Sequence, residues 1–401
     1  MLAVLYLSGP PTVANIFHDV KASEYPNNDS VLEKSSRCLS GWQSLAAVSS
    51  YEKSTWWAFL PFPITSDPCL PYPAIQPAVK ASPDLTLKAV YSRSLESAQA
   101  LDTGVDLYSN DSGVGSTYHD LLLRGDIQAV ILALPILAQP EFIEAALVSG
   151  KHVLSEKPIA GDIKRAEHLI DFYRSDKVQR GATWAVAENF RFLDSFIFGR
   201  EEVKKLGRVL GFSVKQAGCV KPGGKYIETT WRKKPDHQGG FLLDGGVHFV
   251  AGTRLLLGED AKPTALSAYT HLLRAYLPPV DTVDSIWQTK SGITGTISIS
   301  FGTTLSGSEY TVACEKGSVT VLPRKKVIVR QGEEGENHFT ETEFKEEGNG
   351  VKQEVRAWAQ SLVDGTPLPA QSPEEALIDL EILEKMLRSG EQEGQVQTVQ
   401  Y

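Results

Sequence analysis

The amino-acid sequence predicts an α/β protein in two parts: a parallel sheet with helices in the N-terminal half, and a mostly antiparallel sheet in the C-terminal half. A strand–helix–strand pattern between Asp126 and Pro158 indicates the first part. A series of short strand patterns after Val209, joined by Gly-rich or charged turns, indicates the second. A chain of 401 residues has room for two such domains.

The first 73 residues show little sustained periodicity and contain clusters of Asn, Ser and Pro. Five prolines lie between Pro61 and Pro73, and proline lacks the amide hydrogen that regular structure uses. Only the apolar stretch Leu2–Leu7 could form a strand. We interpret residues 1–73 as an atypical segment that could be poorly ordered, not as a domain.

From Ala74 the pattern becomes regular. Ala74–Ala81 is typical of the end of a helix, and Leu85–Tyr91 predicts a buried strand that leads into Ser92-Arg93-Ser94. In dinucleotide-binding sheets the end of the second strand meets the adenosine ribose, where an acid binds the 2′-hydroxyl of NAD and an Arg accommodates the 2′-phosphate of NADP. Since Arg93 is present and an acid is not, NADP(H) is favoured over NAD(H). The alternative is an ordinary surface loop.

The next elements are two short helices and the strand–helix–strand pattern. Helices are expected at Leu95–Ala100 and Tyr118–Leu123. Ala129–Leu134 is a continuous apolar run, as expected for a strand buried on both faces, and Pro135 ends it. A helix over Glu141–Ser149, capped by Gly150, and a strand over His152–Ser155 follow.

A right-handed crossover places the ends of these two strands at the same carboxyl edge of the sheet, where open α/β folds bind ligands. Leu134, Pro135, Glu156, Lys157 and Pro158 therefore lie where chemistry is expected. A further amphipathic helix is predicted over Asp162–Tyr173, and a strand leads into Ala185–Phe192. We place the first domain at residues 74–190.

Residues 191–401 are predicted to form a domain for substrate binding and oligomerisation. In Ile293–Phe301, apolar residues alternate with Thr and Ser, which indicates a sheet with one buried face and one open face. Helices on one face of this sheet are expected at Val351–Val363 and Pro373–Leu387, the latter capped by Ser372. The expected strands are Val209–Ala217, Ala265–Ala275, Val283–Thr289, Ile293–Phe301, Tyr310–Cys314, Ser318–Leu322 and Lys326–Arg330.

Composition excludes several classes of function. The net charge is -9 and basic residues are scattered, which argues against a nucleic-acid partner. No apolar run reaches the roughly 18 to 20 residues of a membrane helix, and Met1–Leu7 is too short for a signal peptide. The four cysteines are far apart with no Cys-x-x-Cys pair. We expect a cytoplasmic protein without a membrane partner.

A second motif contains Thr229-Thr-Trp-Arg and, further on, Gly239-Gly-Phe-Leu-Leu-Asp-Gly-Gly-Val-His248. On a helix, Asp244 and His248 are four residues apart, so both side chains leave the same face. Such a pair is more often a structural hydrogen bond than a catalytic pair, and no third residue suggests a metal site.

Taken together, Glu156-Lys-Pro, Ala187-Glu-Asn-Phe, Trp231-Arg and the Gly-Gly-x-x-x-Asp-Gly-Gly-Val-His segment resemble, in order and spacing, the Gfo/Idh/MocA family of oxidoreductases. The resemblance covers Ala74–Leu387 and is strongest to the fungal NADP-dependent branch. It implies hydride transfer between a nicotinamide and a sugar, polyol, diol or small carbonyl compound. It also implies self-association through the open face of the C-terminal sheet.

The resemblance implies site residues as well. Hydride transfer to or from such a carbon needs a proton partner and a group that stabilises charge on the oxygen. By family position His248 is the acid/base, Lys157 polarises the substrate oxygen or relays its proton, and Asp244 orients or tunes them. All three would contact substrate, as would Tyr226. A cis peptide before Pro158 is also implied. The implied cofactor contacts are Ser92, Arg93, Ser94, Leu134, Pro135, Glu156, Lys157, Asn189, Trp231 and Arg232, and Asn189 could instead be a helix cap.

One departure from the family stands out. Its first strand is followed by a Gly-x-Gly-x-x-Gly turn, whose backbone amides approach the pyrophosphate. Here Phe62–Ala74 contains no glycine, and Gly9 is a poor substitute. Either the N-terminal sequence is not the natural one, or the protein has lost cofactor binding. The second possibility leaves an alternative function, a non-catalytic binding or regulatory homologue.

Overall fold

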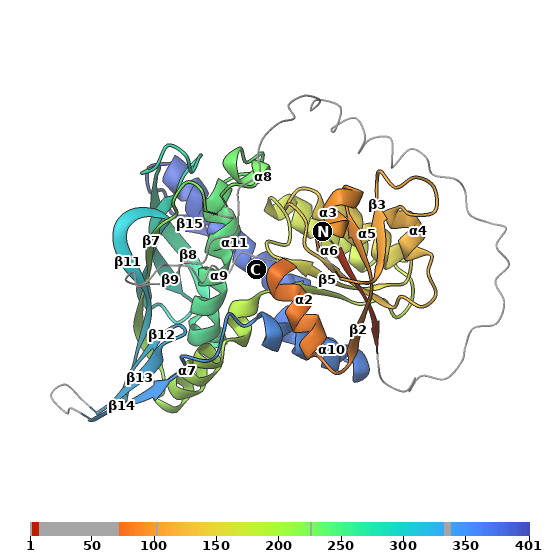
Figure 1. The fold of residues 1–401 in the computed structure, drawn as a ribbon. Coiled ribbons are helices and arrows are strands. Elements are labelled where there is room, and N and C mark those ends of the chain that lie inside the picture. Colours follow the sequence, from red (N-terminus) through yellow and green to blue (C-terminus); the bar gives the residue numbers. More distant parts are fainter. Residues whose placement is uncertain (1, 8–71, 102, 225–226, 333–337) are drawn as a thin grey trace, which may run out of the picture. The chain divides into compact units, whose positions relative to one another are not determined.

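The computed structural model describes residues 2–7, 72–101, 103–224, 227–332 and 338–401 (Figure 1). Its first sheet has six strands in the order β3-β2-β1-β4-β5-β6, which is the order of the doubly wound dinucleotide-binding fold. The strands are β1 (Leu2–Leu7), β2 (Leu85–Ser92), β3 (Asp106–Ser109), β4 (Ala129–Leu132), β5 (His152–Glu156) and β6 (Trp184–Ala187). Apart from β1, neighbouring strands in this sheet run parallel.

Strand β1 runs antiparallel to both of its neighbours. Its first residue, Leu2, pairs with Tyr91 of β2 and with Leu132 of β4. Leu2 therefore lies at the edge of the sheet where β2 and β4 end, and Leu7 pairs with Leu85 at the opposite edge. The expected strand at Leu2–Leu7 is confirmed, but it occupies the central position in reverse. The chain leaves β1 at the edge away from the predicted ligand site.

Helices cover both faces of this sheet, and β4 shows how. Val130 and Leu132 pack into one hydrophobic cluster, whereas Ala129 and Ile131 pack into another, so β4 buries both faces as its continuous apolar run predicts. The first cluster includes Ile143 of α5 (Gln139–Val148) and residues of α6 (Ile163–Tyr173). Short helices α3 (Leu95–Gln99) and α4 (Tyr118–Leu122) complete this part.

The second cluster joins two helices that lie far apart in the sequence. Helix α2 (Tyr72–Ala81) supplies Ile75, and α10 (Val351–Val363) supplies Val355 and Trp358. Figure 1 shows α2 and α10 side by side. The chain thus returns to the first sheet and only then adds its last described strand to the second sheet.

The second sheet has nine strands in the order β14-β13-β12-β11-β7-β10-β9-β8-β15. All of its neighbours are antiparallel except β7 and β10, which confirms a mostly antiparallel sheet. The strands are β7 (Val209–Cys219), β8 (Pro263–His271), β9 (Thr282–Thr289), β10 (Thr294–Ser300), β11 (Gly302–Cys314), β12 (Gly317–Leu322), β13 (Lys326–Gln331), β14 (His338–Glu343) and β15 (Gln397–Thr398).

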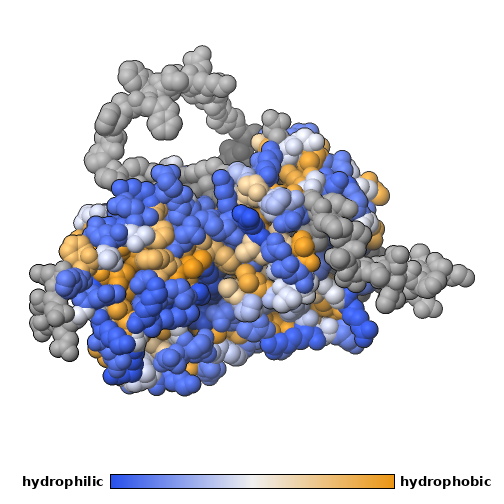
Figure 2. Space-filling view, turned by 90° about the horizontal axis from the view of Figure 1, so that it is seen from below, coloured by the Kyte–Doolittle hydropathy of each residue, from blue (hydrophilic) through white to orange (hydrophobic). Residues whose placement is uncertain are grey.

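One face of this sheet is buried and the other is open. Ile297 and Trp287 are buried, whereas Ile286, the neighbour of Trp287, is 57% exposed on the opposite face. Figure 2 shows hydrophobic residues in patches among polar ones on one side of the molecule. The helices of this part are α7 (Asp194–Lys205), α8 (Thr230–Lys233), α9 (Gly240–Leu257) and α11 (Pro373–Glu391), with short 3₁₀ turns η1 (Asn189–Phe192), η2 (Glu259–Ala261) and η3 (Pro369–Gln371).

Most predicted elements are present, with shifted ends. Helix α10 has the predicted bounds, and Ser372 caps α11 by accepting a hydrogen bond from the Glu375 amide. The strand expected over Ala265–Ala275 ends at His271, and the one expected from Tyr310 begins at Gly302. The sequence patterns did not identify β3, α7, β14 or β15.

Candidate active site

Lys157 follows the last residue of β5, at the carboxyl edge of the first sheet. The peptide bond to Pro158 is cis, as the resemblance implies. The side chain is only 8% exposed, and its Nζ donates to Asp244 Oδ1 at 3.0 Å and to the Asp244 carbonyl oxygen at 2.9 Å. These two bonds connect the edge of the first sheet to helix α9 and place Lys157 beside the Asp244/His248 motif.

Helix α9 carries this motif, and glycines allow it to begin and to pack closely. Gly240 has a φ of 52°, and a Cβ on it would lie 2.2 Å from the Pro278 carbonyl oxygen. A Cβ on Gly245 would lie 2.7 Å from the ring of Phe301. Glycine can let either a ligand or another part of the chain approach closely. For Gly240 and Gly245 the neighbour is the chain itself.

Asp244 is the centre of a buried charge cluster. Its second oxygen, Oδ2, accepts a hydrogen bond from Arg232 Nε at 2.7 Å, and Asp244 and Arg232 are 2% and 6% exposed. Burial disfavours the charged carboxylate, but Lys157 and Arg232 outweigh this effect and hold the pKa of Asp244 well below its usual value. Asp244 therefore remains ionised at neutral pH and stabilises the positive charge of Lys157.

Arg232 also packs on its neighbour in α8. Its guanidinium carbon lies 4.0 Å from the centre of the Trp231 ring, a typical cation–π arrangement. The predicted Trp231-Arg232 pair is thus one stacked unit that is fixed to Asp244. Tyr226, the other predicted residue of this loop, lies outside the described residues.

His248 does not bind Asp244, although the two lie one turn apart. Its Nδ1 lies 2.7 Å from Oε1 of Glu188, which follows β6. The two residues are 1% and 2% exposed, and the ring of Phe190 stacks on the imidazole at 5.2 Å between centroids. Burial disfavours charge on Glu188, but His248 and Arg191 outweigh it, so its pKa lies below its usual value.

Two further carboxyl groups lie near this cluster and behave in the opposite way. Desolvation, with additional repulsion from Glu188 and Asp244, raises the pKa of Glu156 to about 7 although Lys157 opposes it. Burial raises the pKa of Glu354 on α10 well above its usual value, and repulsion from Glu156 and Glu188 adds to the effect. Glu354 is 3% exposed. Carboxyl groups with lowered pKa values and carboxyl groups with raised pKa values therefore coexist around Lys157.

The predicted cofactor contacts that follow β2 and β4 lie at the same sheet edge as Lys157. Strand β2 ends at Ser92, which is buried; Arg93 follows and is exposed. The Ser94 hydroxyl caps α3 by accepting a hydrogen bond from the Ser97 amide. Leu134 and Pro135 follow β4. Among these predicted contacts, the exposed guanidinium of Arg93 is thus available to an external phosphate, whereas Ser94 already has a structural role.

Asn189 opens the 3₁₀ turn after β6 and is 4% exposed. Its amide nitrogen donates to the Asn349 carbonyl oxygen, next to the start of α10. The side chain therefore joins the ends of β6 and α10. The cofactor contact expected of Asn189 stays a prediction.

Comparison with known proteins gives the context for this arrangement. Residues 71–182 match the oxidoreductase family described as having an NAD-binding Rossmann fold, and residues 200–398 match the C-terminal α/β domain of the same family. A dehydrogenase of Fusarium mangiferae is 40% identical over 81% of this chain and 95% of its own length. The chain belongs to the Gfo/Idh/MocA oxidoreductases.

Other members of the Gfo/Idh/MocA family extend the comparison. A D-xylose 1-dehydrogenase (NADP(+)) of Haloferax volcanii is 26% identical over 79% of this chain and 93% of its own length. The crystal structure of an oxidoreductase from Thermotoga maritima superposes with a TM-score of 0.69 at 30% identity and covers 82% of this chain and 93% of that one. In the described part of this Gfo/Idh/MocA chain, no helix is long and apolar enough to cross a membrane.

The predicted cofactor contacts of this family member are described at the two ends of a dinucleotide but not at its middle. The contact of Arg93 with the ribose end, and those of Glu156 and Lys157 with the nicotinamide end, stay predictions. The family's pyrophosphate contact requires a Gly-rich turn between a parallel first strand and the next helix. Here β1 is antiparallel, and Pro73 removes an amide from the first turn of α2. The described residues contain no Gly-rich turn at this position.

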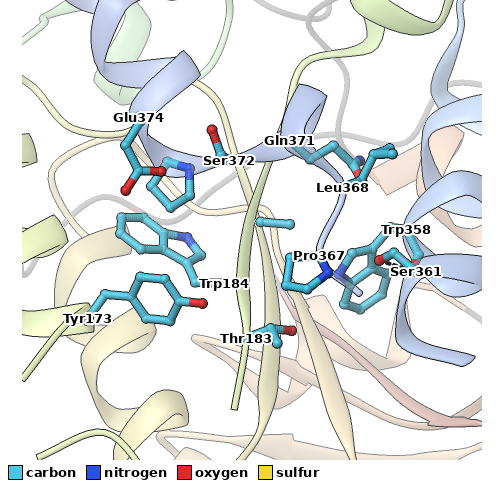
Figure 3. A pocket seen from close by; sticks show the side chains of 12 residues that line it. Tyr173, Thr183, Trp184, Trp358, Ser361, Pro367, Leu368, Gln371, Ser372 and Glu374 are labelled. Carbon is cyan, nitrogen blue, oxygen red and sulfur yellow. Dashed lines mark hydrogen bonds between the residues drawn. The ribbon is translucent and has the colours of Figure 1, made fainter. Parts of the chain in front are cut away.

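A pocket of about 140 Å³ lies apart from these groups. Figure 3 shows Trp184 and Trp358 on opposite sides of it. Trp358 Nε1 and Gln371 Oε1 are buried there and have no hydrogen-bond partner in the described chain. None of the predicted site residues lines this pocket, so it is separate from the candidate active site.

Reasoning from the sequence missed Glu188 and Glu354. Glu188 belongs to the Ala-Glu-Asn-Phe motif that supports the resemblance, and its position directly after a buried strand marks it as a candidate. Glu354 carries no such signal, because an acid in an amphipathic helix is usually exposed.

Proposed function

We propose that this oxidoreductase uses NADP(H) to transfer a hydride to or from a carbon that bears a hydroxyl or carbonyl group in a sugar, polyol, diol or small carbonyl compound. The buried contact of Lys157 with Asp244, beside His248, is the observation that carries the proposal. It supports a site where a substrate oxygen can meet a positive charge and a proton acceptor together.

In this proposal each of the three residues has a distinct task. Lys157 polarises the substrate oxygen, and Asp244 holds the lysine in place and keeps it charged. His248 exchanges the hydroxyl proton through Nε2, which is buried and has no partner in the described chain. A bound nicotinamide would supply the hydride acceptor or donor.

The NADP preference rests on Arg93, because a guanidinium binds a phosphate with charge-assisted hydrogen bonds. The name of the Haloferax relative, which specifies NADP(+), supports this choice. Titration with NADPH, followed by its fluorescence, tests it. We expect saturable binding that weakens by about ten-fold in R93A, the loss of one charge-assisted contact. R180A is the matched control, because Arg180 is exposed before β6, at the opposite edge of the sheet.

Catalysis is tested by turnover with a panel of sugars, polyols and small carbonyl compounds. K157A and H248A should each lower turnover of an identified substrate by roughly 10²- to 10⁴-fold, while NADPH affinity changes little. Unchanged turnover in both variants would overturn the assigned roles.

A second candidate function is a binding or regulatory homologue without dinucleotide chemistry. The reversed β1, and the lack of a Gly-rich turn beside it among the described residues, favour this second function. The same titration separates the two candidates: an NADPH signal that does not respond even at millimolar cofactor would favour the second candidate.

We also propose self-association through the open face of the C-terminal sheet, where Ile286 and Tyr269 are each 57% exposed. Light scattering that gives a mass above one chain would support this, and a strictly monomeric mass would contradict it. The cytosol is the compartment we propose, because the spacing of the four cysteines suggests no disulfide framework.

A further inference from the structure

The imidazole of His248 has two nitrogens in different surroundings. Nδ1 lies 2.7 Å from Glu188 Oε1, whereas Nε2 is buried without a hydrogen-bond partner in the described chain. A buried polar atom without a partner is uncommon, and in a candidate active site it marks the place where a substrate atom can bind. The question is therefore which nitrogen carries the proton before substrate arrives.

Glu188 determines which nitrogen carries the proton, because an ionised carboxylate can only accept hydrogen bonds. The fixed position of the carboxylate comes from the chain around it: the Phe190 amide donates to the same Oε1 at 3.1 Å, and the Phe190 ring covers the imidazole. Nδ1 must then be the donor, so the neutral imidazole presents a basic Nε2.

Asp244 cannot take this role, although the sequence spacing suggests it. One of its oxygens accepts from Lys157 and the other from Arg232. The two acids around α9 thus have separate partners, since Asp244 serves the lysine and Glu188 serves the histidine.

We propose that Glu188 is the positioning residue for His248, which fixes its tautomer and stabilises the imidazolium that forms during the reaction. The inference rests on the proposed function. In the oxidation direction the substrate O–H bond breaks and its proton goes to Nε2, while the hydride from the same carbon goes to the nicotinamide. Nδ1 keeps its proton throughout, and Glu188 accepts none, as for the aspartate of a catalytic triad.

Other charged groups surround the pair and are needed to interpret any pH profile. Arg191 favours the ionised form of Glu188, and the pKa values of Glu156, Glu354, Asp379 and Tyr310 all respond to its negative charge. Lys157 and Arg232 contact Asp244 one turn before His248 on α9. A variant of Glu188 must therefore be compared with a variant of another acid in the same surroundings.

The test is ¹⁵N NMR of protein labelled at its eight histidines, with the His248 signal assigned by its loss in H248Q. We expect the parent to show a protonated Nδ1 and an unprotonated Nε2. E188Q should lose this single tautomer, because its amide can donate to Nδ1 as well as accept from it. E354Q is the control: Glu354 is buried in the same cluster, and removal of its carboxyl should leave the tautomer unchanged.

Kinetics provide the second readout. E188Q should lower kcat by roughly 10²- to 10⁴-fold with little change in NADPH affinity, and it should move the pH at which kcat/KM is half-maximal to lower values, because the imidazolium loses its counter-charge. E188D should recover part of the rate. A parent spectrum with the His248 proton on Nε2 would overturn the proposal even if both Glu188 variants failed to fold. The expected tautomer in a protein without any turnover would support the pairing and overturn the proposed function instead.

Discussion

The carboxyl edge of the first sheet contains two regions that differ in how closely they follow the family. At the end of β5, Lys157 reaches across to Asp244, and Lys157, Arg232, Asp244 and His248 are all buried and paired. At the centre of the same edge, β1 begins where a parallel strand would end. One region has the chemistry of an oxidoreductase, and the described residues of the other contain no Gly-rich turn that could hold the cofactor phosphates.

The difference shows that the two regions depend on different parts of the chain. The Lys157 region is built from residues between 152 and 248, and the two family models match residues 71–182 and 200–398. The β1 region depends on a strand near residue 1 whose backbone satisfies the hydrogen bonds of β2 and β4. A central strand position can be filled in either direction, because both ladders pair the backbone amides, but only the parallel direction delivers a turn to the ligand edge.

Removal of Asp244 should have the largest effect. D244A leaves the positive charges of Lys157 and Arg232 buried without their shared partner, and breaking a buried ion pair in this way costs about 3–5 kcal/mol. We expect the urea midpoint of D244A to fall accordingly. D284A, at an exposed acid on β9, is the control and should change stability by less than about 0.5 kcal/mol. Equal urea midpoints for D244A and the parent would show that the ion pairs of Asp244 do not stabilise the Lys157 region.

Disruption of β1 should have a smaller effect that tests the other region. Ala3 pairs with Val90 and with Ile131, so its amide lies inside a sheet with neighbours on both sides. A3P removes that donor and leaves an acceptor unpaired, which costs about 1–3 kcal/mol. A3V adds comparable bulk and keeps the amide hydrogen. The difference in stability between the two variants therefore measures the contribution of the backbone hydrogen bond. If A3P and A3V unfold at the same urea concentration, β1 does not occupy the centre of the sheet in solution.

The sequence could predict the Lys157 region because its signals are local. An apolar run, a helix-length segment and a second strand determine where Lys157 lies, and spacing of four residues puts Asp244 and His248 on one helical face. The partner of His248 could not be predicted this way. Glu188 lies 60 positions away, and its approach depends on how β6 packs against α9.

The direction of β1 is a second limit. Apolar composition indicated a strand at Leu2–Leu7, but a strand pattern reads the same in both directions, so pairing alone decides the orientation. Strand β3 was missed for a simpler reason, since its four residues, Asp106–Ser109, are too short for a period to be recognised.

The third effect is gradual and depends on pH, and it concerns Glu354, the buried acid behind the site. The pKa of Glu354 is raised in the folded protein, so above its ordinary unfolded value of 4.5 the folded state binds more protons than the unfolded state. Stability that depends on this group is therefore present at low pH and declines as pH rises, by at most about 1.4 kcal/mol per pH unit. E354Q replaces the neutral acid with a neutral amide of the same shape and removes this dependence. Between pH 5 and pH 8 the free energy of unfolding should fall less steeply in E354Q than in the parent.

The slope that remains in E354Q should include a contribution from Glu156, whose raised pKa of about 7 acts in the same direction over this range. E346Q changes an exposed glutamate and should keep the slope of the parent. Parallel pH profiles for E354Q and the parent would mean that Glu354 is ionised in the folded protein, and the electrostatics of the Lys157 region would have to be revised.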